Sequence, residues 1–473
     1  MKPLLLALTL LTLAITAPTH ADPLRAGAAA VVITPPLGTP INGNMRPIIA
    51  ENVHDELHAR ALALTDGKTT LAFVVVDNCL IPREVFDAAR ALLKTEVELP
   101  PENVMMSATH SHSCGAVADV YLCDASPSYR AALPRYIADA VRRAMHNFVP
   151  ARVAWGSGSL PQEVFCRRWR LKEGAKAPNP FGGNDLAKMN PPIASPDLLE
   201  PADSTDPELS FLAVQTAAGK PLALLANYSL HYVGGVGSAD LSADYFGAFA
   251  DRIQLLMGAD RQDPPFVGIM SNGTSGDINN NNFRVPNTRL KEPYAQIRKV
   301  ADEAANEILR VLNSGIEWHD NVILCAATRE LTIATRKPTA EDVEKAKAIV
   351  AGRPPLALKT LPEIYAREQI LLAQYPDTIT MPITAFRIGD LAIAGWPNEV
   401  FASSGLALKK DSPIKPMFTI SLANGWYGYL PPPDQHPLGG YETWRSRTSY
   451  LEVGAEPKIR EAILQVLGEL AQP

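Results

Sequence analysis

One short apolar run does most to limit the folds open to this chain. Leu71-Ala72-Phe73-Val74-Val75-Val76 carries no polar side chain, which is typical of a strand buried on both faces of a sheet. Helical periodicity follows at 82–93. A buried strand followed by a helix favours the α/β class, in which helices cover the faces of sheets.

The same alternation continues along the chain. Further strands are predicted at 104–108, 222–228, 266–270, 383–388, 391–395 and 418–422. Helices are predicted at 133–148, 242–258, 290–313, 339–351, 361–374 and 456–470. There is no internal repeat and no linker-like tract, so we expect mixed β-sheets flanked by helices in a single large domain over residues 22–473. One closing helix follows Tyr450, and no separate C-terminal module is expected.

The N-terminus has the composition of an export signal. Lys2 precedes an apolar run from Leu4 to Ile15, and small residues stand before Asp22. This order predicts a signal peptide over residues 1–21, cleaved after Ala21, and hence a secreted or periplasmic protein. The run is shorter than the roughly 20 residues that a transmembrane span needs, so no membrane anchor is expected.

The net charge argues against one class of partner, and the cysteine spacing argues against one kind of metal site. The net charge of −6 implies no basic surface, which argues against a nucleic-acid partner. The sequence holds no CxxC pair, which argues against a zinc site built from cysteines. Cys114 and Cys123 are near enough to close a small disulfide loop in an exported protein, or both remain buried thiols.

Two of the nine histidines lie in the loop after the strand at 104–108, in Thr109-His110-Ser111-His112-Ser113. On an extended segment both rings point to the same side, because side chains alternate along a strand. That arrangement suits two metal ligands, or one ligand and one group that faces a substrate. Two inert loop histidines are the alternative.

Three more segments place candidate ligands after predicted strands. His231 ends the strand at 222–228, where it reaches a metal or remains a capped core histidine. Glu399 follows the strand at 391–395 and is either a carboxylate ligand, which would complete an N/O zinc shell, or a solvated side chain. The loops at 424–429 and 439–442 add tyrosines, as aromatic walls of a site or as loop packing.

Taken together and in order, these segments resemble the neutral (non-lysosomal) ceramidase family over most of residues 25–455. The resemblance rests on Ile33-Thr34-Pro35-Pro36, His58-Ala59-Arg60-Ala61-Leu62, Thr109 to Gly115, Asn227 to His231, Pro397-Asn398-Glu399, Asn424 to Tyr429, and Tyr441-Glu442. It implies a zinc hydrolase of amide bonds with Zn²⁺ bound by four side chains: His110, His231, Glu399 and Tyr429. It further implies three side chains around the scissile amide: His112, Tyr441 and Arg167, with Arg168 as the alternative arginine.

The sequence departs from the family at the serine of its Gly-Asp-(Val/Ile)-Ser motif. Here the segment reads Gly276-Asp277-Ile278-Asn279, so Asp277 is kept and Asn279 replaces the serine. An amide cannot act as that nucleophile, although it hydrogen-bonds a substrate oxygen. Thr274 and Ser275 precede the turn and are expected to point elsewhere.

We therefore expect direct attack by water bound to the metal. His112 would serve as general acid and base, Arg167 and Tyr441 would steady the oxyanion, and Asn279 would orient the substrate or the water. The sequence leaves the oligomeric state open.

Three functions remain: an amidase acting on N-acyl sphingoid lipids, a zinc hydrolase of the same fold acting on a sugar-linked or smaller amide, ester or glycoside, and a non-catalytic binding protein. The retained ligand set argues against the third. The segment 172–207 is predicted to be a long surface loop near the site, or a plain connection. It is polar, with Phe181 as its single aromatic residue, and this favours the second function, because a lipid amidase needs an apolar cleft.

Overall fold

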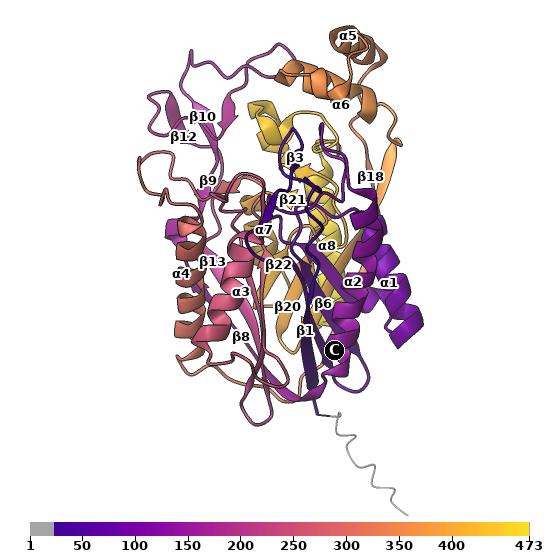
Figure 1. The fold of residues 1–473 in the computed structure, drawn as a ribbon, viewed down its shortest axis with the longest axis vertical. Helices are drawn as coiled ribbons and strands as arrows, with labels where there is room; N and C mark the ends of the chain where they lie inside the picture. Colours follow the sequence, from indigo (N-terminus) through magenta and orange to yellow (C-terminus); the bar gives the residue numbers. More distant parts are fainter. Residues whose placement is uncertain (1–22, 473) are drawn as a thin grey trace, which may run out of the picture.

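The computed structural model describes residues 23–472, so the predicted signal peptide lies outside the described residues. Two sheets and a set of outer helices form one domain of mixed α/β class (Figure 1). This confirms the predicted fold class. No helix in the described part of the chain is long and apolar enough to cross a bilayer.

The larger sheet has eight strands in the order β16-β14-β13-β8-β1-β5-β6-β7. Their bounds are β1 (Arg25–Val32), β5 (His58–Thr65), β6 (Thr70–Val76), β7 (Val104–Ala108), β8 (Val149–Ser159), β13 (Glu208–Thr216), β14 (Pro221–Tyr228) and β16 (Val267–Asn272). Among the described residues, main-chain pairing joins the two halves only between β1 and β8, at Arg25–Pro150 and Ala26–Val149. The sheet bends at this junction, so that β16 of one half lies against β5, β6 and β7 of the other, and each half has its own layer of helices.

The smaller sheet has the order β18-β19-β20-β22, with bounds Leu324–Ala334, Thr378–Ile388, Leu391–Gly395 and Met417–Ile420. Its inner face packs on both halves of the larger sheet in one apolar cluster. Alternation along the strands sorts the side chains: Phe73 and Val75 of β6 enter this cluster with Phe386 of β19, while Val74 and Val76 face the outer helices.

In the described part of the chain, eight α-helices lie outside the sheets: α1 (Arg83–Val97), α2 (Pro127–His146), α3 (Asp244–Leu256), α4 (Ala295–Leu312), α5 (Ala340–Val350), α6 (Leu361–Leu372), α7 (Ala402–Asp411) and α8 (Ala455–Ala471). Helices α1 and α2 cover the β1–β7 half of the larger sheet, and α3 and α4 cover the other half. Helices α7 and α8 contribute to the cluster on the outer face of the smaller sheet. Helices α5 and α6 project at the upper end of the molecule (Figure 1).

Short strand pairs shape the loops at that end. They are β2 (Pro40–Ile41) with β3 (Ile48–Ile49), β4 (Asn52–Val53) with β15 (Asp240–Leu241), β9 (Phe165–Cys166) with β17 (Ile278–Asn279), and β21 (Glu399–Val400) with β23 (Tyr429–Leu430). A three-stranded sheet joins β10 (Arg168–Leu171), β11 (Ala187–Met189) and β12 (Leu198–Pro201). The segment 172–207, predicted to be a loop, therefore supplies two strands of this small sheet.

Two further predictions need correction. Helix α2 begins at Pro127, six residues before the predicted start at 133, because proline suits the first helical turn and apolar periodicity does not register it. The disulfide alternative is wrong: Cys114 and Cys123 are buried free thiols, as are the other cysteines of the described residues except the half-buried Cys325.

Candidate metal centre

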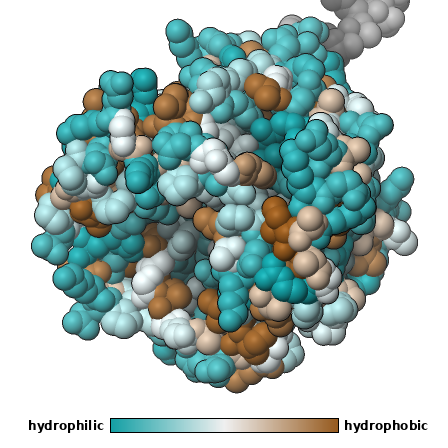
Figure 2. Space-filling view, turned by 90° about the horizontal axis from the view of Figure 1, so that it is seen from above, coloured by the Kyte–Doolittle hydropathy of each residue, from teal (hydrophilic) through white to brown (hydrophobic). Residues whose placement is uncertain are grey.

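Four predicted ligands follow the carboxyl ends of four strands. His110 follows β7, His231 follows β14, Glu399 opens β21 after β20, and Tyr429 opens β23 after β22. Strands β21 and β23 run parallel, and Glu399 is the register partner of Tyr429. The structure thus brings together four residues that are far apart in the sequence. Seen from above, the molecule is hollowed near its middle (Figure 2).

The hydrogen bonds of two imidazoles define which nitrogen is free. Nδ1 of His110 lies 2.9 Å from the Cys79 carbonyl oxygen, and Nδ1 of His231 lies 3.0 Å from the Ser275 carbonyl oxygen. A carbonyl only accepts, so each Nδ1 carries the proton and each Nε2 presents a lone pair. These Nε2 atoms are 3.0 Å apart, where two lone pairs repel unless a cation lies near both.

Glu399 completes the set with a carboxylate oxygen. Its Oε1 accepts a hydrogen bond from Nε1 of Trp426 at 3.1 Å. Its Oε2 lies 3.2 Å from Nε2 of His110 and is buried without a hydrogen-bond donor among residues 23–472. Two imidazole lone pairs and one orphan carboxylate oxygen, within 4.8 Å of one another, are the donors that Zn²⁺ takes. The residues present therefore fit a divalent cation.

Burial and neighbouring charges set the protonation states of His231 and Glu399. Burial, with the charges of Arg167 and its histidine neighbours, lowers the pKa of His231 well below its ordinary value. Burial alone would raise the pKa of Glu399, but His110, Tyr429 and Arg167 together outweigh it and leave that pKa below the ordinary value. A neutral imidazole and an ionised carboxylate are the forms that bind metals.

His112 approaches the same point by a different route from the one predicted. His110 has a φ of 71°, so the segment turns in the left-handed region, and the rings do not converge through alternation along a strand. Nε2 of His112 still lies 3.1 Å from Nε2 of His110. The His112 ring hydrogen-bonds the Gly43 backbone and stacks on Tyr232, with ring centroids 3.8 Å apart. Burial, His110 and Arg167 lower its pKa well below the ordinary value, so it is neutral.

The structure distinguishes the two candidate arginines. Nη1 of Arg167 donates to Nε2 of His231 at 3.2 Å, and its Nη2 donates to the Tyr429 hydroxyl at 3.0 Å. Its Nε donates to Glu442 at 2.8 Å. Arg168 pairs with the other oxygen of Glu442 and lines no part of the cavity. Arg167 is therefore the arginine of the site, and Arg168 fixes the carboxylate that holds it.

A cavity of about 220 Å³ opens onto these groups, lined by His110, His112, Arg167, Glu399, Tyr429 and Tyr441 among others. The Tyr441 ring lies 5.6 Å from that of Tyr429. An apolar cavity of about 340 Å³ adjoins it, and Met45, Met189 and Tyr441 line both. Ala177, Pro178 and Ala187 of the 172–207 segment line the apolar cavity.

The Gly-Asp-Ile-Asn segment lies beside this cavity and supplies none of its lining. Nδ2 of Asn279 donates to Oδ1 of Asn190 at 2.9 Å, and Asn190 lines the cavity. Asp277 is fully buried, and its Oδ1 accepts from the backbone of Ala402 at the start of α7. Its carbonyl oxygen accepts from the Arg167 backbone, so Asp277 supports the arginine loop. The hydroxyl of Ser275 does not line the cavity: it donates to Asn272 and lies 3.5 Å from Nδ1 of His231.

Sequence reasoning assigned no role to four neighbours of the centre. Trp426 donates to Glu399, Tyr232 stacks on His112, Glu442 holds Arg167, and the Cys79 thiol lines the cavity 3.8 Å from Nδ1 of His110. Tyr232 follows His231, Glu442 follows Tyr441, and Trp426 lies in the loop that carries Tyr429. This proximity to predicted site residues is the sequence signal that could have identified these three.

Neutral ceramidases have this fold. A crystal structure of neutral ceramidase from Pseudomonas aeruginosa matches 95% of this chain and 75% of its own, with a TM-score of 0.72 and 18% identity. A structure described as ceramidase complexed with C2 matches the same shares, with a TM-score of 0.71 and 18% identity. No family model matches the sequence, and no curated protein does.

Proposed function

We propose that the protein is a zinc-dependent hydrolase that cleaves the amide bond of an N-acyl sphingosine-type substrate. One observation carries the proposal: the unprotonated Nε2 atoms of His110 and His231 and the orphan Oε2 of Glu399 meet at one buried point beside a cavity. The fold shared with neutral ceramidases supports the same conclusion.

His110, His231, Glu399 and Tyr429 would hold the zinc. When bound, zinc lowers the pKa of water to about 7 and polarises a carbonyl group. The hydrogen bonds of both Nδ1 atoms to backbone carbonyls fix the ring orientations that this requires.

His112 is the proposed general base and acid. It is neutral and lines the cavity, and the Gly43 backbone and the Tyr232 ring hold it in place. Its Nε2 would accept a proton from the attacking water and pass it to the nitrogen of the leaving amine.

Arg167 and Tyr441 would steady the negative charge that develops on the carbonyl oxygen. Three of the five guanidinium N–H groups of Arg167 are engaged, by Glu442, His231 and Tyr429, which leaves two for a substrate oxygen. Burial, with Tyr121 close by, raises the pKa of the Tyr441 phenol well above its ordinary value, so Tyr441 keeps its proton to donate. Asn279 would act through Asn190.

The substrate class rests on the apolar cavity. Met45, Met189, Trp444 and Tyr441 provide apolar walls beside the centre, suited to an acyl chain. A second candidate is the same chemistry on a small or sugar-linked amide, favoured by the modest cavity at the centre, about 220 Å³ against the usual range of about 300–1,000 Å³.

Release of fatty acid from fluorescent ceramides of graded acyl length tests the proposal, with small N-acyl amides, esters and glycosides run in parallel. Turnover is expected to disappear after chelation and to return with Zn²⁺. Ser275→Ala is expected to retain turnover, because its hydroxyl does not line the cavity. Full-rate hydrolysis by the metal-free protein would contradict the proposal, and turnover restricted to small amides would select the second candidate.

A further inference from the structure

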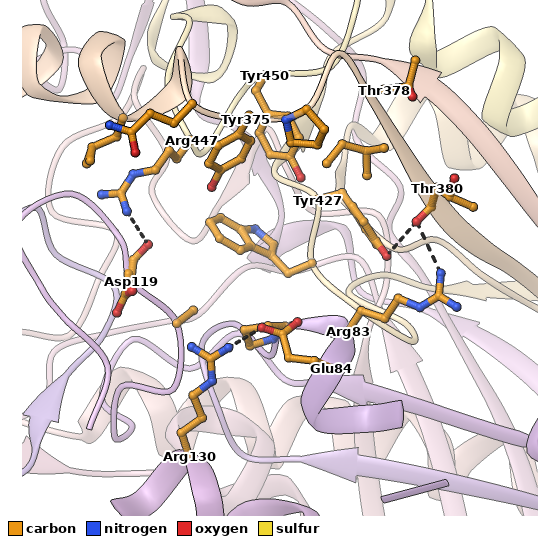
Figure 3. A pocket seen from close by; sticks show the side chains of 17 residues that line it. Arg83, Glu84, Asp119, Arg130, Tyr375, Thr378, Thr380, Tyr427, Arg447 and Tyr450 are labelled. Carbon is orange, nitrogen blue, oxygen red and sulfur yellow. Dashed lines mark hydrogen bonds and ion pairs between the residues drawn. The ribbon is translucent and has the colours of Figure 1, made fainter. Parts of the chain in front are cut away.

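A second cavity lies behind the loop that carries Tyr429. Its volume is about 740 Å³, larger than that of the cavity at the metal centre. Tyr375, Tyr427 and Tyr450 line one side, and Glu84 and Arg130 line the opposite side (Figure 3). The mechanism proposed above uses none of these residues.

Three segments separate the two cavities. Residues 118–119, 426–427 and 447 line the larger cavity, while residues 120–121, 429 and 448 line the one at the metal centre. Each segment therefore presents side chains to both sides. Trp426 lines the larger cavity and donates a hydrogen bond to Glu399.

The three arginines that line the larger cavity are already paired with carboxylates. Arg83 is paired with Asp87 and Glu330, and Arg130 is paired with Glu84. The guanidinium of Arg447 donates two hydrogen bonds to Glu368, at 2.8 and 2.9 Å. No guanidinium is left to attract an anion. The carboxylates of Glu84 and Asp119 also line the cavity, and they can accept hydrogen bonds from the hydroxyl groups of a neutral ligand.

The remaining lining combines aromatic surface with hydroxyl, amide and carboxylate groups. The rings of Tyr375 and Tyr450 meet edge to face, with centroids 5.3 Å apart. The Tyr427 hydroxyl bonds the Thr380 carbonyl, whereas those of Tyr375 and Tyr450 have no hydrogen-bond partner among residues 23–472. The Gln374 side chain is exposed at the rim.

We propose that this cavity binds a neutral carbohydrate. The C–H face of a pyranose ring would pack on the aromatic side chains, which offer flat apolar area. Its hydroxyl groups would exchange hydrogen bonds with the free phenols of Tyr375 and Tyr450, with Gln374 and with the carboxylate of Glu84. The site is distinct from the metal centre and does not depend on the proposed hydrolysis.

Calorimetric titration of the whole protein with methyl β-glucopyranoside, methyl β-galactopyranoside, cellobiose and lactose tests this, with glucose 6-phosphate as the anionic comparison. Saturable binding of at least one neutral sugar is expected, at millimolar concentration or below. Tyr375→Ala and the exposed Gln374→Ala are each expected to weaken it at least tenfold. Tyr136→Ala, which removes an exposed tyrosine of α2 outside the cavity, is the matched control and is expected to leave binding unchanged.

Binding of none of the neutral sugars, binding of the phosphorylated sugar alone, or equal binding by wild type and both cavity variants would overturn the proposal. The titrations are run on metal-free and on zinc-treated protein. Sugar binding by the metal-free protein would stand even if the hydrolase proposal failed, so the two outcomes are separable.

Discussion

At the scale of single residues, the three clustered histidines differ in their proposed roles as zinc ligands and as the acid–base group. Nδ1 of His231 bonds a backbone carbonyl and its Nε2 faces His110, whereas His112 lines the cavity. We predict that His231→Ala abolishes stoichiometric zinc binding. His112→Ala is expected to keep the metal and lose about 10²–10⁴-fold in kcat, the usual contribution of a general base. Atomic emission of the purified variants, with turnover assays, checks both. Loss of zinc from His112→Ala would instead make His112 a ligand.

A glycine controls where His112 can lie. Gly43 has a φ of 108°, and a Cβ there would come within 2.4 Å of Cγ of His112. We predict that Gly43→Ala lowers kcat by about 10–100-fold through displacement of the ring, with zinc retained. Gly38→Ala is the matched control, because Gly38 also has a positive φ, of 88°, but a Cβ there contacts nothing within 4 Å. Equal losses of activity in both variants would show that backbone strain, and not contact with His112, is responsible.

At the scale of elements, α6 anchors the loop that carries Tyr441 and Thr448. Glu368 of α6 is fully buried and accepts both hydrogen bonds from the guanidinium of Arg447. We predict that Glu368→Ala lowers the free energy of unfolding by about 3–5 kcal/mol, because it leaves a buried guanidinium without its partner. Glu344→Ala, which breaks the exposed pair with Lys347, is expected to cost at most about 1 kcal/mol. Chemical denaturation measures both, and similar small losses would contradict the prediction.

The elements also show what periodicity predicts and what it misses. Strands β6, β14 and β20 are largely apolar, and the sequence predicts them within a residue. Strand β5 reads His-Ala-Arg-Ala-Leu-Ala-Leu-Thr, and alanine, leucine and arginine all favour helices. It is a strand because β1 and β6 pair with it on both sides, and such tertiary pairing is invisible in local sequence.

At the scale of the whole molecule, local sequence predicts some features of the site, and tertiary structure decides the others. The ligand candidates His110, His231, Glu399 and Tyr429 were predictable because each follows a strand and their order resembles a known family. The distances between them arise only when the ends of strands from both sheets meet. Glu442 illustrates the limit: its two arginine partners lie more than 270 positions earlier in the chain, so no local pattern identifies them.

The stability of the whole molecule is expected to depend on the protonation of Asp277, which joins α7 to the loop that carries Arg167. Burial, reinforced by the charge of Asp203, raises the pKa of Asp277 to about 8 in the folded protein, against about 3.9 in an unfolded chain. Between these values the folded state holds one more proton than the unfolded state, so stability falls as pH rises toward 8. The buried His112 and His231, whose folded pKa values are lowered, have the opposite effect, but only below about pH 6.5, where unfolded histidines gain protons.

The window from pH 6.5 to 8 therefore isolates Asp277. Asp277→Asn keeps an oxygen for the Ala402 N–H and cannot ionise. We predict that wild type loses about 1.5–2 kcal/mol of unfolding free energy relative to this variant across the window, since each pH unit below the folded pKa is worth about 1.4 kcal/mol. Urea denaturation of metal-free protein at several pH values measures the difference, and removing the metal keeps zinc-linked protons out of the comparison. Parallel stability profiles for the two proteins would mean that Asp277 is ionised in the fold, with the Ala402 and Arg168 interactions outweighing its burial.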